Sequence, residues 1–334
     1  MIPGSPSPAQ PAPSGFALRP HEESDYEAMS RVQGRRYPDH PVPPEEFRRW
    51  NWILDSPHIF RRRLVVEESS TGEVVGWGAV YNHPWTYDRD KYAIEVAIDP
   101  GSERRGLGRC VYDELERVAQ GRKAVALWAT VRASDERSVR FFARCGFVER
   151  RRGWSSRLSL GSVIPSPPGP SGRGEGMGVI FTTIAEEGPE RRDVRERLFR
   201  LHSEAGKDVQ SLGQPTSPSF DQFLKETFGS PGFLPEGVFV ARVEARYVSM
   251  TSLFKLPQEP DTLHVGFTGT LREFRGKGFA SELKRRSVDF AKARGYRYLT
   301  TDNDSQNAPM WAINERLGFK TERVLIHGEK GLLA

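Results

Sequence analysis

Two short stretches of this chain combine glycine with arginine or lysine immediately before a helical pattern. They are Glu103-Arg104-Arg105-Gly106-Leu107-Gly108 and Arg275-Gly276-Lys277-Gly278-Phe279-Ala280. The start of a helix carries unpaired N–H groups and partial positive charge, and glycine lets an anion approach them without obstruction by a Cβ atom. Both stretches therefore predict the binding of a phosphate group, most simply a pyrophosphate.

The two stretches belong to a repeat that covers most of the chain. Gly106 aligns with Gly278 and Gly146 aligns with Gly318, both at an offset of 172 residues. A segment rich in proline and glycine, PSPPGPSGRGEGMG, separates the two copies and is typical of a linker. We predict a disordered tail, an N-terminal domain, a linker and a C-terminal domain at residues 1–15, 16–162, 163–178 and 179–334.

Each copy predicts the same order of elements. A strand, one or two helices, a hairpin and a long strand precede the glycine turn, and a helix, a strand and a final helix follow it. The corresponding segments are the long strands 92–100 and 263–270, the later strands 124–130 and 296–301, and the final helices 138–144 and 310–317. The fold class that this order predicts is α/β in both copies.

Composition limits the alternatives. The chain has 334 residues, a net charge of +5, two cysteines and no CxxC or HExxH motif, so a metal site is not expected. Acidic residues are scattered among the basic ones, which argues against a nucleic-acid partner. No apolar run reaches membrane-spanning length, and the first fifteen residues do not resemble a signal peptide. We expect a cytoplasmic protein.

Two familiar phosphate-binding motifs fit poorly. The P-loop pattern GxxxxGK[ST] is absent from the chain. The dinucleotide fingerprint GxGxxG needs a third glycine where Ser281 stands, and it should follow the first strand of its domain. Asp302 could serve as the ribose-binding acid of such a site, but the turn comes too late in each copy for that fold.

The turn resembles the acetyl-CoA turn (Q/R)xxGx(G/A) of the GNAT acyltransferases, the Gcn5-related N-acetyltransferase superfamily. Residues 275–280 match it in full, whereas residues 103–108 depart from it at Glu103, which brings a carboxylate close to the expected pyrophosphate. A further family feature is an asparagine followed by a helix and a Gly-Phe pair. Asn307 holds the asparagine position in the second copy and Asp135 holds it in the first.

The resemblance implies that each copy is a mixed, mostly antiparallel sheet flanked by helices, with two strands splayed around the pantetheine of acetyl-CoA. Gly269 is interpreted as a β-bulge residue. The cofactor-binding residues implied in the second copy are Thr268, Gly269, Thr270, Arg275, Gly276, Lys277, Gly278, Phe279, Ala280, Asn307 and Asn314. Those implied in the first copy are Val96, Ala97, Ile98, Arg104, Arg105, Gly106, Leu107, Gly108 and Arg109.

The resemblance implies a reaction in which an amine attacks the thioester directly. Phe142 and Asn314 stand where many members have a tyrosine that serves the thiolate, so neither copy has the usual acid. His264 occupies the position of the base in histone-acetylating members, and Tyr92 is its counterpart. Glu95 is interpreted as structural, and the basic run from Lys284 to Arg286 as a solvated helix face.

The sequence thus favours an acetyl-CoA-dependent N-acetyltransferase acting on an amine of a small molecule or peptide, as a monomer or homodimer. The second copy is predicted to be catalytic because it keeps the full turn, the asparagine and a candidate base. The alternative is a non-catalytic CoA-binding or regulatory protein with degenerate GNAT domains.

Overall fold

The computed structural model describes residues 12–56, 58–162, 178–208, 212–213 and 218–332. The predicted tail and linker lie largely outside these residues, so both stay predictions. The elements of the N-terminal half are β1 (Phe16–Pro20), α1 (Tyr26–Arg36), α2 (Pro44–Ile53), β2 (Arg61–Glu68), β3 (Val74–Tyr81), β4 (Lys91–Ile98), α3 (Leu107–Gly121), β5 (Ala126–Arg132), α4 (Glu136–Arg144) and β6 (Val148–Ser159).

The C-terminal half repeats this order with one additional short helix. Its elements are β7 (Val179–Thr183), α5 (Ile184–Glu187), α6 (Arg192–Gly206), α7 (Phe220–Thr227), β8 (Phe233–Val243), β9 (Arg246–Leu256), β10 (Glu259–Thr270), α8 (Phe279–Ala293), β11 (Tyr298–Asp304), α9 (Ala308–Leu317) and β12 (Lys320–Gly331). The predicted order is confirmed as far as the final helices. The sequence reasoning missed the long last strand of each half, β6 and β12.

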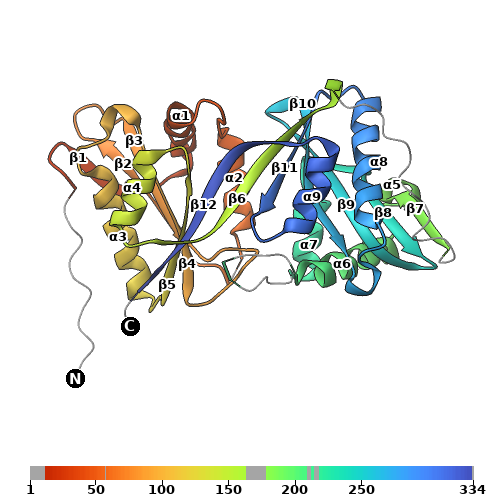
Figure 1. Ribbon diagram of the computed structural model, residues 1–334. Helices are drawn as coiled ribbons and strands as arrows, with labels where there is room; N and C mark the ends of the chain where they lie inside the picture. Colours follow the sequence, from red (N-terminus) through yellow and green to blue (C-terminus); the bar gives the residue numbers. More distant parts are fainter. Residues whose placement is uncertain (1–11, 57, 163–177, 209–211, 214–217, 333–334) are drawn as a thin grey trace.

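One continuous sheet runs through both halves (Figure 1). Its order is β1-β2-β3-β4-β5-β12-β6-β11-β10-β9-β8-β7. Counted from either edge toward the centre, corresponding strands of the two halves occupy the same positions, except that the last strands β6 and β12 are exchanged. The pairs β4·β5 and β10·β11 are parallel, and every other neighbouring pair is antiparallel. The predicted fold class, mixed and mostly antiparallel, is confirmed.

The two halves exchange their last strands. Strand β12 pairs with β5 from Leu325↔Arg132 to Gly331↔Ala126, while β6 pairs with β11 from Tyr298↔Ser159 to Asp304↔Gly153. The two exchanged strands also pair with each other at the centre of the sheet. Each half therefore completes its sheet with a strand of the other half.

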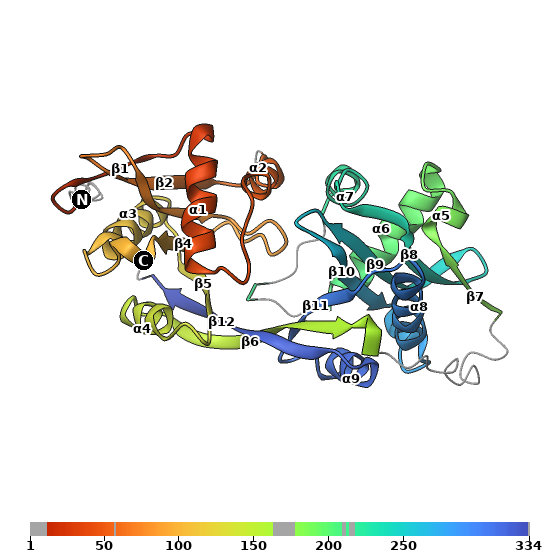
Figure 2. The same ribbon diagram turned by 90° about the horizontal axis from the view of Figure 1, so that it is seen from above.

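Helices cover both faces of the sheet. On one face α1 and α2 pack on the N-terminal half around Met29 and Trp77, and α5, α6 and α7 pack on the C-terminal half around Leu198. On the other face, α3 and α4 pack on the N-terminal half and α8 packs on the C-terminal half. Figure 2 shows α1, α2, α6 and α7 on one side of the central strands β6 and β12, with α9 on the other and α4 beside the end of β6.

The helix after each glycine turn is fixed by an apolar stripe. Leu107, Val111 and Leu115 recur every four residues in α3 and are all at most 1% exposed. Burying a leucine or valine side chain contributes roughly 2 kcal/mol, so this stripe holds α3 on strands β3 and β4. The start of the helix is thereby held at the end of β4.

The parallel strand pairs open into two splays. Pairing of β4 with β5 ends at Ala93↔Trp128, and pairing of β10 with β11 ends at Val265↔Thr301, although all four strands continue. The β-bulge expected at Gly269 is wrong in position, because Gly269 pairs regularly with Met250. The register of β10 against β9 shifts between Val265 and Thr268 instead.

Candidate cofactor and acceptor sites

The turn of the N-terminal half leaves the start of α3 open. Gly106 has a φ of +81°, in the left-handed region that favours glycine, and no side chain caps the helix. The first helical bond joins the Cys110 N–H to the Gly106 carbonyl. A Cβ atom at Gly108 would lie 3.7 Å from its nearest neighbour, Ile98. The N–H groups of this first turn are therefore reachable by an anion.

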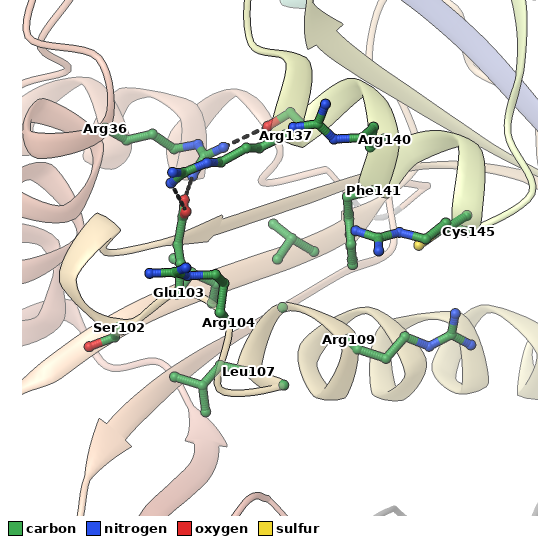
Figure 3. Close-up of a pocket in the computed structure, with 16 residues that line it drawn as sticks. Arg36, Ser102, Glu103, Arg104, Leu107, Arg109, Arg137, Arg140, Phe141 and Cys145 are labelled. Carbon is green, nitrogen blue, oxygen red and sulfur yellow. Dashed lines mark hydrogen bonds and ion pairs between the residues drawn. The ribbon is translucent and has the colours of Figure 1, made fainter.

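A cavity of about 710 Å³ lies over this turn, between the end of β4, α3 and α4 (Figure 3). Val96, Ile98, Leu107 and Phe141 give it an apolar lining. Six arginines also line it, and they are Arg36, Arg104, Arg109, Arg137, Arg140 and Arg144. A cavity with an apolar interior and guanidinium groups around a helix start fits a ligand that joins an organic chain to phosphates.

Glu103 is the one acid among the described residues that line this cavity. Its carboxylate accepts hydrogen bonds from Arg36 at 2.5 Å and from Arg137 at 2.9 Å (Figure 3). Two guanidinium groups thus neutralise the charge of Glu103, the residue at which this turn departs from the family pattern. The carboxylate that the sequence placed near the pyrophosphate is turned toward these arginines.

Asp135, at the family's asparagine position, caps α4 by accepting from the Ser138 N–H at 3.0 Å. Although burial opposes it, hydrogen bonds from Ser138 and the nearby Arg36 guanidinium hold the pKa of Asp135 below its usual range. Asn307 caps α9 in the same way, through the Met310 N–H at 3.3 Å. Both residues therefore set the start of the last helix.

The turn of the C-terminal half has the same backbone and different surroundings. Gly278 has a φ of +86° immediately before α8. Asp208, which follows α6, accepts from Arg272 and, at 2.5 Å, from Arg275, and Arg275 also donates to the Thr270 carbonyl at 3.0 Å. The arginine that the sequence assigns to the cofactor is thus paired with a carboxylate.

Other residues assigned to the cofactor in this half also have partners within the chain. The hydroxyl of Thr268 bonds to that of Thr251 at 2.8 Å, and the hydroxyl of Thr270 bonds to that of Ser249 at 2.7 Å. The Phe279 side chain is 4% exposed and belongs to the core. Their predicted contacts with the cofactor stay predictions.

A buried polar network joins three elements of the C-terminal half. The Lys284 ammonium of α8 donates to the Asn314 side chain of α9, and the amide of Asn314 donates to Asn303 of β11. Lys284 is 2% exposed and Asn314 is 0% exposed. Burial lowers the pKa of Lys284 to about 7. The prediction of a solvated Lys284 is wrong, because α9 and β11 cover this face of α8.

His264, the base predicted from the sequence, lies on β10 near the end of its pairing with β11. Its Nδ1 atom is 3.1 Å from the Thr300 hydroxyl and its Nε2 atom is 3.9 Å from Asp302. Burial lowers the pKa of His264 from its ordinary value, although Asp302 opposes the shift. The imidazole is therefore neutral at pH 7 and can accept a proton.

The N-terminal half places a different candidate at its splay. Tyr92, the counterpart of His264, is 2% exposed and packs in the core beneath α3. Glu95 lies two residues beyond the last β4·β5 pair, is exposed, and points to the face opposite Val96. It accepts a hydrogen bond of 2.6 Å from the buried Tyr81 hydroxyl. The interpretation of Glu95 as structural stays a prediction, and the place of Glu95 beside the splay makes it a second candidate base.

The C-terminal half contacts the N-terminal half on the face that carries Glu95. Glu226 of α7 accepts from the Trp85 indole at 3.2 Å, and Lys225 donates to the Trp52 carbonyl at 3.2 Å. The Lys225 ammonium also lies 4.1 Å from the centre of the Trp52 ring. One wall next to this face is therefore built by the other half.

Comparison with known proteins agrees with this architecture. The model of the acetyltransferase (GNAT) family matches residues 23–147 and 201–319, one match in each half. The chain belongs to the GNAT acetyltransferase family, as a tandem member, and is an acyltransferase. Among the described residues, no helix is long and apolar enough to span a bilayer.

Curated relatives match in part. A mycothiol acetyltransferase of Thermobifida fusca is 26% identical over 240 residues, which are 68% of this chain and 71% of the relative. A [ribosomal protein bS18]-alanine N-acetyltransferase of Salmonella typhimurium is 39% identical over 56 residues, 17% of this chain and 38% of that protein.

Solved structures share the fold. A tandem GNAT protein from the clavulanic acid biosynthesis pathway has a TM-score of 0.72 at 20% identity, covering 95% of this chain and 98% of its own. A GCN5-related N-acetyltransferase from Sphaerobacter thermophilus has a TM-score of 0.70 at 19% identity, covering 96% of both chains. At these identities the likeness concerns the fold alone.

Proposed function

We propose that this protein is an acetyl-CoA-dependent N-acetyltransferase whose N-terminal half holds the cofactor and acetylates a small amine. The observation that carries the proposal is the cavity over Gly106, with its apolar interior and six arginines. The sequence favours the other half, but there Arg275, the first residue of the turn and the counterpart of Glu103, is paired with Asp208. Membership of the family supports the reaction class.

The residues present fit the cofactor. The N–H groups at the start of α3, with Arg104, would hold the pyrophosphate, and Val96 and Phe141 would contact the organic chain. Bound acetyl-CoA would supply a thioester whose carbonyl carbon is attacked by the amine, so that a C–N bond forms, the C–S bond breaks and CoA leaves as a thiolate.

Glu95 is the base in this proposal. It lies at the opening of the splay, where β4 and β5 separate, on the face away from the cavity. A carboxylate there takes the proton that the amine loses, and the hydrogen bond from Tyr81 fixes its orientation. Phe142 has no proton to donate to the thiolate, so the thiolate is protonated by solvent.

Two measurements test the proposal. Calorimetric titration with acetyl-CoA should give one site per chain, and free thiol release should depend on an added amine in a panel of small amines. Absence of acetyl-CoA binding would overturn the proposal. Binding without any amine-dependent thiol release would establish the alternative, a CoA-binding protein without transferase activity.

A further inference from the structure

Three buried donor atoms beneath α1 and α2 have no hydrogen-bond partner among the described residues. They are the Nε and Nη1 atoms of Arg63, on β2, and the indole Nε1 atom of Trp77, on the adjacent strand β3. The Phe47 ring of α2 approaches both, with its centre 6.0 Å from the Arg63 guanidinium and 5.5 Å from the Trp77 ring. Unmade hydrogen bonds of buried donors are costly, so such groups usually have a partner.

Among the described residues, Arg63 forms no ion pair either. Its guanidinium lies 5.8 Å from the centre of the Tyr26 ring, and the carboxylate of Glu95 is not within ion-pair distance of it. Burial lowers the pKa of Arg63, while Tyr26 and Glu95 act in the opposite direction. Aromatic rings attract a cation, but they are poor hydrogen-bond acceptors for its N–H groups. A water molecule could accept a hydrogen bond here, but it could not balance the charge.

Arg63 and Glu95 stand in one row across the sheet. The strand register pairs Arg63 with Ala79, and Ala79 with Glu95. Two strand spacings separate the Cα atoms of Arg63 and Glu95 by about 10 Å. Ala79 adds only a methyl group between the two long side chains, although Tyr81 of the same strand reaches Glu95 with its hydroxyl. A cation and an anion therefore flank Ala79 on the same face of β3.

The charges of this row suit a particular ligand. In an α-amino acid the amine and the carboxylate lie about 3 Å apart, so one molecule can offer an anion to Arg63 and an amine to Glu95. A guanidinium group binds a carboxylate through two parallel hydrogen bonds, which fixes the ligand's orientation as well as its charge. An acceptor held in this way would present its amine to Glu95.

We propose that the acceptor carries a carboxylate close to the amine that is acetylated, as in an amino acid, and that Arg63 binds this carboxylate. The inference rests on the proposed function, since Glu95 is its base. Arg63 is then a specificity-determining residue that distinguishes an amino acid from the corresponding amide or simple amine. The unpaired guanidinium acquires its counter-ion only when the acceptor is bound.

Thiol release with matched acceptors tests this inference. Each of several amino acids is compared with its carboxamide and with its decarboxylated amine, at saturating acetyl-CoA. The wild-type protein should favour the free carboxylate by about tenfold or more in kcat/KM, since a site built around a charged group rejects analogues that lack it. Arg63→Met should bring that ratio close to one, chiefly through a higher KM for the amino acid, and Arg63→Lys should retain part of it.

The matched control is Arg62→Met, one residue away on the opposite face of β2, where the side chain is exposed. It should keep the wild-type ratio, and acetyl-CoA affinity should be unchanged in all three variants, which also shows that they are folded. An equal kcat/KM for amino acid and amide in the wild type, or an unchanged ratio in the Arg63 variants, would overturn the inference alone. Absence of transfer to every amine would overturn the proposed function and this inference with it.

Discussion

Gly106 and Gly278 hold the same left-handed conformation before α3 and α8, yet the surroundings of the two turns differ. In the N-terminal half the acid of the turn, Glu103, is neutralised by two arginines that line a cavity. In the C-terminal half Asp208 brings a carboxylate to the arginine of the turn. A turn motif thus predicts a backbone shape, whereas ligand binding also depends on charges that distant segments bring to it.

The C-terminal half contributes to the N-terminal half in other ways. Its last strand, β12, pairs with β5 along the splay of the N-terminal half, and its helix α7 contacts Trp85 and Trp52 beside the face that carries Glu95. The C-terminal half also differs from the N-terminal half in the buried Lys284 network and in the pairing of Arg275 with Asp208.

The largest expected effect comes from placing a carboxylate in one turn or in the other. Gly108 and Ala280 are corresponding positions, and neither has the positive φ that would strain a substitution. Gly108→Glu should weaken acetyl-CoA binding by roughly 1000-fold, because the new carboxylate would meet the cofactor's phosphates in a confined space.

Ala280→Glu is the matched control for Gly108→Glu. It should change the calorimetric affinity by no more than about twofold, which is within the usual range for a surface substitution. The reverse pattern, with Ala280→Glu abolishing binding and Gly108→Glu leaving it intact, would return the cofactor to the C-terminal half, as the sequence predicted.

The next effect separates the two candidate bases. Glu95→Gln preserves the shape of the side chain and its contact with Tyr81 but cannot take a proton. It should lower kcat by about 100-fold, the usual loss when a general base is removed, with acetyl-CoA affinity unchanged. Thiol release under saturating substrates gives kcat, and calorimetry gives the affinity.

His264→Gln provides the comparison for Glu95→Gln. It should leave kcat within about twofold of the wild-type value and the pH–rate profile unchanged, since surface or remote substitutions rarely do more. Loss of activity in His264→Gln, with activity retained in Glu95→Gln, would assign catalysis to β10 and contradict the role proposed for the N-terminal half.

The elements predicted correctly are those that local chemistry determines. Glycine at 106 and 278 fixes a left-handed residue before a helix, and glycine at 146 and 318 takes positive φ after one, in both cases whatever surrounds them. Lys284 could not be assigned from its neighbours in the chain, because Asn314 and β11 bury it. The exchange of β6 and β12 could not be predicted either. Backbone hydrogen bonds do not depend on side chains, so each strand could pair equally well within its own half or with the other half.

Candidate-site residues divide in the same way. Of the residues predicted from the turn, Arg104, Gly106, Leu107, Gly108 and Arg109 line the cavity, whereas Arg105 does not. Their cofactor contacts stay predictions. Arg36 was missed, because it lies 67 residues before Glu103 and reaches it only through the packing of α1. Glu95 was seen, but its role depends on where the pairing of β4 with β5 ends, which periodicity does not reveal.

The smallest expected effect concerns stability and the Lys284 ammonium that the C-terminal half buries. Burial lowers the pKa of Lys284 from 10.5 to about 7. Between these two pH values the unfolded chain binds a proton that the folded chain does not, so this group destabilises the fold increasingly as pH falls from 10.5 to 7, and by a constant amount below that. A shift of this size corresponds to about 5 kcal/mol.

Lys284→Met removes that cost but leaves Asn314 without its donor, which costs about 1–3 kcal/mol. The free energy of unfolding should therefore rise by about 2 kcal/mol at pH 7, and the gain should shrink as pH rises toward 10. Urea denaturation from pH 7 to 10 measures it, with Lys292→Met, at an exposed position on the same helix, as a control for removing a surface ammonium group. A variant less stable than the wild type at pH 7, with a deficit that narrows at high pH, would mean that the ammonium is stabilised where it is buried. The C-terminal half would then hold a charged group that supports its fold, and the contrast with the N-terminal half would rest on Asp208 alone.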